Sequence, residues 1–147
     1  MGKPFAVICD LDGTLCDIGH RFPLLNVDFK KFSDLLLDDQ PKEMVIKLLQ
    51  FLRFRDYKII FVSARAEHYR QATRLWMAQH CPGFENFPLF LRGVNDCRFD
   101  EEVKREIVTN LVMPEYDVKL VIEDRDNVVS MYRAMGLECW QVANGDY

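Results

Sequence analysis

Several protein classes are disfavoured by what this 147-residue sequence lacks. Its five cysteines are an odd number without a Cys-x-x-Cys pair, and its three histidines share no metal-ligand spacing. Neither a disulfide framework nor a zinc site is therefore indicated. Basic residues are not in excess either. The net charge of -4 argues against a broad surface that follows nucleic-acid phosphates, although a small basic pocket for one phosphate stays open.

The N-terminal region has no long hydrophobic stretch. The apolar run after Pro4 contains five residues, which is too short for a signal peptide or a membrane helix. Ala6 stands where an N-myristoylation signal at Gly2 would have Ser or Thr. Repeats, low-complexity tracts and long linkers are also missing. We therefore expect residues 1–147 to form a single domain without membrane attachment, located in the cytoplasm or, for a phage-encoded protein, in the host cytoplasm.

The sequence does contain a regular alternation of short apolar runs with amphipathic stretches. The predicted strands are residues 5–9, 58–62, 88–91, 118–122 and 137–142. The predicted helices are residues 28–37, 41–52, 67–80, 100–111 and 127–135, with Pro41 at the start of the second helix and Asp100 as the N-cap of the fourth. Apolar strands that alternate with helices predict an α/β fold, in which helices cover both faces of a parallel sheet.

Helical periodicity and residue type also predict which side chains are buried. For the helices, the expected core residues are Met44, Val45, Leu48, Leu49, Leu52, Tyr69, Ala72, Trp76, Met77, Val103, Ile107, Val108 and Leu111. Trp140, in the last predicted strand, is also expected in the core.

Polar residues follow three of the predicted strands. Asp10 and Asp12 come after the first strand, Ser63 after the second, and Glu123 with Asp124 after the fourth. Because the carboxyl ends of parallel strands meet at one edge of a sheet, we expect these side chains to lie close together. Carboxylates held so near one another repel unless a cation or a shared proton intervenes. An oxygen-rich cluster of this kind suits Mg²⁺.

Such a cluster can carry out phosphoryl transfer. A carboxylate can attack phosphorus and form an aspartyl-phosphate that water then hydrolyses. The transferring group needs positive charge and hydrogen-bond donors, which Ser63 and Lys104 can supply. Thr14 offers a further hydroxyl, and four arginines fall in or beside loops at the same edge, namely Arg21, Arg65, Arg92 and Arg125. Each residue alone also fits a turn, a cap or a solvated surface, so the hypothesis depends on their convergence.

The stretch from Asp10 to Thr14 reads Asp-Leu-Asp-Gly-Thr and resembles the first motif of the haloacid dehalogenase (HAD) superfamily. The resemblance implies a three-layer Rossmann-like fold around a five-stranded parallel sheet in the order 5-4-1-2-3, with a minimal cap. It implies that Asp10 is the nucleophile and Asp12 the general acid and base. It also implies phosphate binding by Ser63 and Lys104, and Mg²⁺ binding by Asp10, Asp12 and Asp124. The implied supporting residues are Thr14, Asp100, Glu123 and Arg125.

Residues 62–65, Asp100 with Lys104, residues 117–125 and the stretch 136–146 are similar to the phosphatase domain of bacteriophage polynucleotide kinase/phosphatase. This resemblance implies removal of 3′-phosphates from nucleic-acid ends or from nucleoside 3′-phosphates. It also implies substrate contacts by Arg21, Arg65 and Arg92. The phosphate-binding loop of that family's kinase module is absent from the sequence, so 5′-kinase activity is not expected. Glu123 stands where Asp is more usual, which favours Asp124 as the direct metal ligand.

Other interpretations stay open at this point. A general nucleotidase or small phosphate-ester phosphatase would use the same motif, and the short insertion between Asp17 and Gln40 leaves room for large and small substrates. A receiver-like phospho-acceptor domain would carry its aspartate after a middle strand, whereas the predicted middle strands end at Ser63 and near Arg92. A non-catalytic binder of 3′-phosphate ends would not need paired aspartates. The sequence does not indicate DNA or RNA preference, oligomeric state or a partner ligase.

Overall fold

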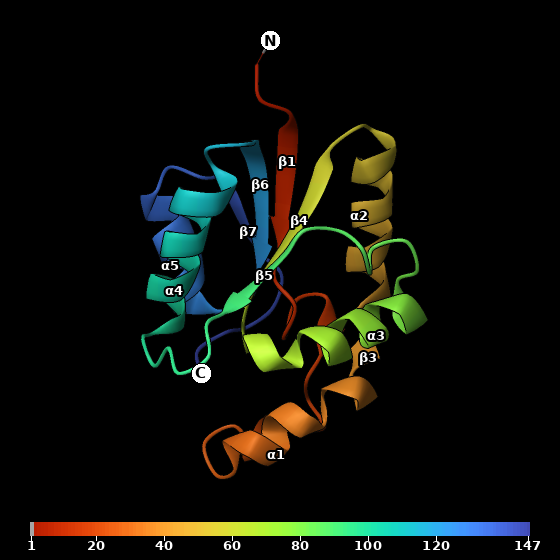
Figure 1. Cartoon of the computed structure of the whole chain (residues 1–147), viewed down its shortest axis with the longest axis vertical. Coiled ribbons are helices and arrows are strands. Elements are labelled where there is room, and N and C mark those ends of the chain that lie inside the picture. Colours follow the sequence, from red (N-terminus) through yellow and green to blue (C-terminus); the bar gives the residue numbers. More distant parts are fainter. Residues whose placement is uncertain (1) are drawn as a thin grey trace.

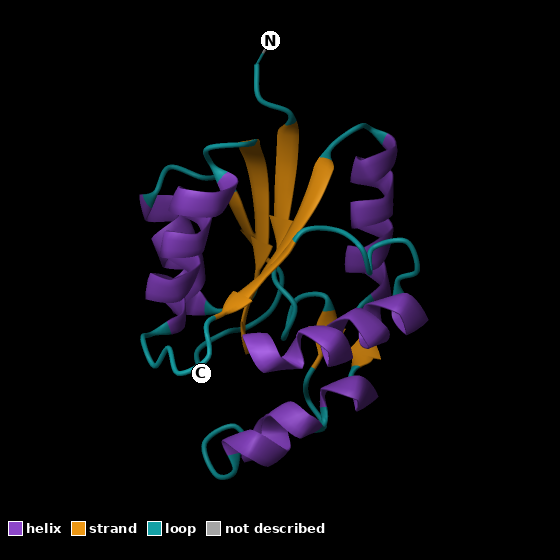
Figure 2. Cartoon of the chain, in the orientation of Figure 1, coloured by secondary structure: helices purple, strands orange, loops and turns teal. Residues whose placement is uncertain are grey.

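A five-stranded parallel sheet between two layers of helices forms the centre of the computed structural model, which describes residues 2–147 (Figure 1, Figure 2). The strands lie in the order β5-β4-β1-β6-β7, and each neighbouring pair is parallel. Counted along the chain, these five strands have the order 3-2-1-4-5, which is the predicted order read from the other edge. The predicted α/β class and strand order are therefore confirmed.

The strands of this sheet are β1 (Phe5–Cys9), β4 (Lys58–Ala66), β5 (Leu89–Arg92), β6 (Asp117–Glu123) and β7 (Cys139–Gln141). One helical layer contains α2 (Glu43–Phe54) and α3 (Arg70–His80), and the other contains α4 (Asp100–Ile107) and α5 (Asp126–Ala134). A short 3₁₀ turn, η3 (Glu67–Tyr69), precedes α3, and a π-helical turn, η4 (Val108–Val112), follows α4. Among residues 2–147, no helix is long and apolar enough to span a membrane.

The side chains of β1 show why both faces of the sheet are covered. Val7 and Cys9 pack into the core beneath α2 and α3, whereas Ala6 and Ile8 pack into the core beneath α4 and α5. Successive side chains of a strand point to opposite faces, so an unbroken apolar run fills two cores at once. The carboxyl end of β1 is thereby held at the middle of the sheet, where polar residues follow it.

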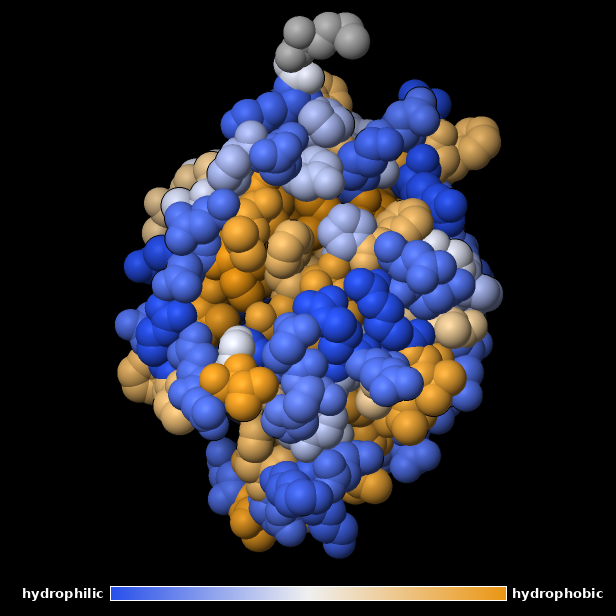
Figure 3. All heavy atoms as spheres, in the orientation of Figure 1, coloured by the Kyte–Doolittle hydropathy of each residue, from blue (hydrophilic) through white to orange (hydrophobic). Residues whose placement is uncertain are grey.

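Residues 18–39, which we call the inserted segment, lie outside the three layers. They connect two short antiparallel strands, β2 (Cys16–Asp17) and β3 (Gln40–Pro41), and contain η1 (Phe22–Leu24), α1 (Phe29–Asp34) and η2 (Leu36–Asp38). The turn η2 packs against α3, and Figure 1 shows α1 at the end of the molecule where the strands finish. Figure 3 shows apolar atoms mixed with hydrophilic ones over this end. The insertion is short, as the sequence predicted.

Two helix starts differ from the prediction. Pro41 pairs with Cys16 in β3, so α2 begins at Glu43. Asp100 is the first residue of α4 and not its N-cap, because Phe99 occupies the cap position and its N–H donates to the Glu102 carboxylate at 3.1 Å. The Asp100 carboxylate is consequently available for contacts outside its own helix.

Three predicted core residues are wrong. Met44 is 74% exposed because it lies about 200° around α2 from the buried Ile46. Leu111 is 51% exposed and Val112 is buried in its place, since the wider π-helical turn η4 delays the inward position by one residue. Trp140 is 49% exposed because β7 is an edge strand.

Tyr69 and Ala72 are also less buried than predicted, because Thr73 with Trp76 and Met77 forms the buried face of α3. The remaining predicted core positions of the helices are buried or partly buried. The strand β4 extends to Ala66, four residues further than predicted. Ser63 therefore lies within this strand and not after it, which matters for the site described next.

Candidate active site

The loop after β1 is a tight turn that is joined to the end of β6. The Asp10 N–H donates to the Ile122 carbonyl at 3.0 Å, and the N–H groups of Thr14 and Leu15 both donate to the Leu11 carbonyl. Gly13 has a φ of +80°, a left-handed value that other residues rarely adopt. A Cβ at Gly13 would lie 2.2 Å from the nearer Asp124 carboxylate oxygen. The absent side chain is thus what lets two acidic strand ends meet.

Asp10, Glu123 and Asp124 form a buried acidic cluster at this junction, which we call the acidic cluster. Each can offer one carboxylate oxygen, and these oxygens all lie within 4.8 Å of one another. Lys104, which is 3% exposed, reaches the cluster from α4. Its ammonium donates to Asp10 Oδ1 at 2.8 Å and to Glu123 Oε2 at 2.7 Å. One lysine faces three carboxylates, so negative charge is in excess.

The pKa directions in the acidic cluster reflect this excess. Burial and the nearby Glu123 carboxylate raise the pKa of Asp10, although Lys104 opposes the rise. Burial and Glu123 likewise raise the pKa of Asp124, against the hydrogen bond from Tyr147. For Glu123, burial raises the pKa but Lys104 outweighs it, so the pKa is lowered overall. An all-oxygen donor set with surplus negative charge fits a hard divalent cation such as Mg²⁺.

Two further side chains hold the acidic cluster in place. Thr14 Oγ1 lies 3.3 Å from Asp10 Oδ2 and 3.1 Å from Asp124 Oδ1. The Tyr147 hydroxyl donates to Asp124 Oδ2 at 2.6 Å, and its ring meets the Phe22 ring edge to face at 5.1 Å. Tyr147 was not predicted as a site residue, because it lies just after the stretch 136–146 and far along the chain from Asp124, Phe22 and the Asp10–Thr14 motif. It joins the acidic cluster to the inserted segment.

Asp12 belongs to a second cluster, in which two arginines contact its carboxylate. Arg21 Nη2 donates to Asp12 Oδ1 at 2.5 Å, and Arg65 Nη2 donates to the same oxygen at 2.7 Å. Burial raises the pKa of Asp12, but Arg65 and Arg21 outweigh this effect and hold the pKa well below its usual range. Asp12 is therefore an ionised carboxylate in this conformation.

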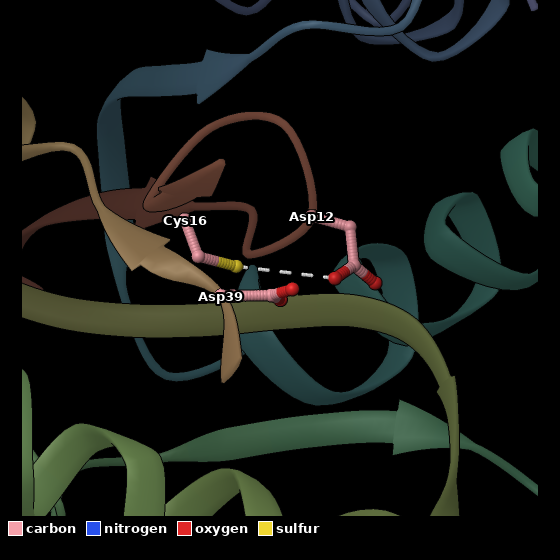
Figure 4. Close-up of side chains that lie close together, drawn as sticks. All are labelled: Asp12, Cys16 and Asp39. Atoms are coloured by element: carbon pink, nitrogen blue, oxygen red, sulfur yellow. Dashed lines mark hydrogen bonds between the residues drawn. The ribbon is translucent and has the colours of Figure 1, made fainter. Parts of the chain in front are cut away.

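Asp39 completes this second cluster and was not recognised as a site residue from the sequence, where it only preceded a predicted helix. Its carboxylate accepts hydrogen bonds from Arg21 at 2.7 and 2.6 Å and from Arg65 at 3.4 Å. Figure 4 shows Asp12, Cys16 and Asp39 facing one another closely enough to suggest a metal site. Because the two guanidinium groups already bind these carboxylates, the cluster fits an ion-pair network better than a metal ion.

The remaining predicted site residues come from β4, β5 and the start of α4 and α5. Ser63 is buried, and its Oγ accepts the Arg65 N–H at 3.2 Å. Arg92 donates to Asp100 Oδ1 at 2.5 Å, and Arg125 donates to the other Asp100 oxygen. Asp100 thus links the ends of two elements at the rim of the site.

A cavity of about 450 Å³ lies over both clusters. Every predicted site residue except Thr14, which lies beneath it, lines this cavity. One wall is apolar and comes largely from the inserted segment, with Ile18, Leu25, Phe29, Phe32 and Leu36. The lining also includes a polar set, namely Arg92, Arg98, Asp100 and Arg125. The cavity therefore combines a charged floor with an amphipathic entrance.

Comparison with known proteins identifies the family. The model of the polynucleotide kinase PNKP phosphatase domain matches residues 4–147. The chain belongs to this family. It is a phosphatase domain of the HAD class, and this membership disfavours the receiver-like and non-catalytic alternatives.

Two similar proteins are much longer than this PNKP-type phosphatase domain. A candidate bifunctional polynucleotide kinase/RNA ligase of Autographa californica nuclear polyhedrosis virus is 31% identical over 131 residues, covering 88% of this chain and 18% of the viral protein. A chain in the Pnkp1/Rnl/Hen1 RNA repair complex is 32% identical with a TM-score of 0.85, covering 99% of this chain and 44% of that one. The chain thus spans less than half the length of either relative.

A class C acid phosphatase from Bacillus anthracis, solved with tungstate bound, shares the fold at lower similarity. Its TM-score is 0.69 at 17% identity, and the match covers 100% of this chain and 69% of that one. At this identity the likeness shows the fold alone.

Because Gly13 lies so close to Asp124, a side chain at position 13 is expected to disturb the acidic cluster of this phosphatase domain. Gly13→Ala is expected to lower phosphatase activity at least about 100-fold, because a Cβ there must displace the Asp124 carboxylate from the acidic cluster. The left-handed backbone adds a stability cost of about 1–2 kcal/mol. Activity per folded molecule and urea denaturation check the two effects.

Gly136 provides a matched control for this substitution. Its φ is +81°, and a Cβ there would meet nothing within 4 Å. Gly136→Ala should therefore show the same kind of stability cost with near-normal activity. Equal activities for the two variants, after correction for the folded fraction, would contradict the importance of the Gly13–Asp124 contact.

Proposed function

We propose that this domain is a Mg²⁺-dependent polynucleotide 3′-phosphatase, which removes the phosphate from 3′-phosphorylated nucleic-acid ends or from nucleoside 3′-phosphates. The observation that carries the proposal is the position of the buried Asp10, bound to Lys104 within the acidic cluster, at the floor of a cavity with an apolar wall. A phosphate on the floor would leave its sugar and base facing that wall. Family membership and the names of the relatives favour a nucleic-acid end as the substrate.

Asp10 is the proposed nucleophile. Lys104 keeps positive charge beside the Asp10 carboxylate and, together with Ser63, would hold phosphate oxygens. The carboxylates of Asp10 and Asp124 and the backbone carbonyl of Asp12 would hold Mg²⁺, which when bound supplies positive charge to the phosphate oxygens. The surplus negative charge of the acidic cluster supports this assignment. Thr14, Glu123 and the Asp100 ion pairs would keep these groups in place.

The reaction would proceed in two balanced steps. An Asp10 oxygen attacks phosphorus, the bond from phosphorus to the ribose oxygen breaks, and Asp12 gives a proton to that oxygen. Water then attacks the aspartyl-phosphate and passes its proton to Asp12. The bond between phosphorus and the Asp10 oxygen breaks and inorganic phosphate leaves, so that Asp10 is again a free carboxylate and Asp12 again a protonated carboxyl group, as at the start of the first step.

Asp12 can act as an acid only if its hydrogen bonds with Arg21 and Arg65 weaken, so that its carboxylate can be protonated. The guanidinium groups of Arg21 and Arg65 hold Asp12 ionised in the substrate-free conformation, which suits a base but not an acid. We propose that the substrate draws hydrogen bonds of Arg65 away from Asp12 and so allows the carboxyl group to take up a proton. Arg92, whose side chain is partly exposed at the rim, would contact the nucleotide itself.

Metal removal tests this proposal directly. Phosphate release from a 3′-phosphorylated oligonucleotide is expected to fall at least about 100-fold after exhaustive chelation and to return when Mg²⁺ is added. Asp124→Asn should raise the Mg²⁺ concentration needed for half-maximal activity. Asp126→Asn is a matched control, because its carboxylate binds the Gln141 side chain outside the acidic cluster. Full activity after chelation would contradict the proposed metal site.

A further inference from the structure

The buried position of Asp39 has no explanation in the proposed chemistry. Asp39 is the last residue of the inserted segment, and its side chain has no solvent exposure. Its backbone carbonyl accepts the indole N–H of Trp76 at 2.9 Å, so its main chain is fixed to α3. A buried carboxylate is costly unless it is paired, which indicates that its partners are specific.

Arg21 is the first of these partners and uses its whole guanidinium group. Its Nε and Nη2 bind the two carboxylate oxygens of Asp39 at 2.7 and 2.6 Å, in the paired geometry that fixes both groups. Its Nη1 donates to the Phe32 carbonyl at 3.2 Å, and its guanidinium carbon lies 4.3 Å from the centre of the Phe32 ring. The hydrogen bond from Nη2 to Asp12 is therefore made by a group with little freedom to move.

Arg65 is the second partner and approaches from β4. Its Nε and Nη2 contact Asp12, its Nη2 also lies 3.4 Å from Asp39, and its Nη1 donates to the Thr73 hydroxyl at 3.1 Å. Two guanidinium groups thus face two carboxylates, so charge is balanced. If Asp39 lost its charge, both arginines would be left with Asp12 as their one anionic partner within this network.

We propose that Asp39 is a positioning residue for Asp12, acting through Arg21 and Arg65. By binding both guanidinium groups from the inserted segment, Asp39 fixes where they meet the Asp12 carboxylate, and it offers Arg65 a second anionic partner when Arg65 releases Asp12. This inference rests on the proposed function, in which Asp12 exchanges a proton with the leaving oxygen. It assigns the inserted segment a part in the chemistry in addition to its place in the cavity wall.

The test compares leaving groups. Asp39→Asn should slow phosphoenzyme formation from a nucleoside 3′-phosphate about 100-fold, the low end of what general acid catalysis contributes. The same variant should slow the reaction of p-nitrophenyl phosphate no more than about threefold, because an aryl oxide leaves without much protonation. Asp12→Asn should show the same selectivity. The double variant should be little slower than Asp12→Asn alone, since both substitutions affect one function.

A purely structural role for Asp39 would give a different result. Loss of folded protein or general loosening would slow both substrates equally, and that outcome would overturn the inference. His20→Ala is the matched control, because His20 also binds Asp39, at 2.8 Å, but does not touch Asp12. It should leave the ratio of the two rates unchanged.

Two alternative experiments apply if the first comparison cannot be made. If Asp39→Asn does not fold, Arg21→Lys replaces it, since lysine keeps the charge but cannot make the paired bonds to Asp39. A selective loss in Arg21→Lys supports the inference, and equal losses overturn it. If the unmodified protein prefers another alkyl phosphate, the proposed 3′-specificity fails, and the same comparison with that ester still tests Asp39.

Discussion

Asp10→Asn is expected to abolish turnover, with a loss of about 10⁴-fold or more for both p-nitrophenyl phosphate and a 3′-phosphorylated oligonucleotide. An amide cannot replace the carboxylate oxygen that attacks phosphorus. The loss should be large for both substrates, because each needs the Asp10 oxygen to attack phosphorus whatever its leaving group. Steady-state and single-turnover assays at saturating Mg²⁺ measure this loss of activity. The purified variant should also form no detectable phosphoenzyme.

The thermal stability of Asp10→Asn, unlike its activity, should rise or stay the same. Burial and the Glu123 carboxylate already disfavour the Asp10 charge, so the neutral amide relieves repulsion in the metal-free acidic cluster. We therefore expect the metal-free variant to unfold at an equal or higher temperature than the unmodified protein. This separates the nucleophile role from a folding defect.

Glu123→Gln is the matched control for Asp10→Asn. It removes the other carboxylate partner of Lys104, at 2.7 Å, but leaves the proposed nucleophile intact. It should reduce activity far less than Asp10→Asn. Retention of most activity in Asp10→Asn, or equal losses in the two variants, would contradict the assignment of Asp10 as nucleophile.

The convergence of the main site residues could be predicted from the sequence, because in a parallel sheet the carboxyl ends of neighbouring strands lie at one edge. Once β1, β4 and β6 were predicted as parallel neighbours, Asp10, Ser63 and Glu123 had to lie near one edge. The structure brings them to one cavity. Their immediate surroundings depend on short apolar runs and on Gly13, and both are visible in the sequence.

Asp39 and Tyr147 could not be predicted in the same way. Each is distant in sequence from the motif, and each reaches the site through an irregular segment whose path has no periodicity. Asp100 was predicted as a helix cap from local preference, and as a supporting residue only through the family resemblance. Its actual contacts, with Arg92 and Arg125, depend on how three elements end next to one another. Long-range polar networks of this kind follow from the tertiary structure.

The errors in the predicted core have a similar origin. The positions of Leu111 and Trp140 depend on a π-helical turn and on which strand lies at the sheet edge. A strict helical period cannot reveal the first, and residue type does not reveal the second. Val103 and Ile107, which precede the irregular turn, are buried as predicted.

The second large expected effect is discrimination between phosphate positions. We expect phosphate release from a 3′-phosphorylated end to exceed release from a 5′-phosphorylated end by about 100-fold or more. The physical reason is that the apolar wall and the arginines at the rim can orient a nucleoside in a fixed way above the charged floor. A general nucleotidase with the same fold would lack this preference.

The most direct measurement of the preference for 3′-phosphates uses matched oligonucleotides. The same sequence is prepared with a 3′-phosphate or a 5′-phosphate and assayed with Mg²⁺ beside the corresponding 3′- and 5′-mononucleotides, with Asp10→Asn as the blank. Rapid release from the 3′-phosphates, with little from the 5′-phosphates, is the predicted result. Faster release from the 5′-phosphates, or equal release from both, would contradict the proposed 3′-phosphatase function while leaving the fold and the nucleophile unaffected.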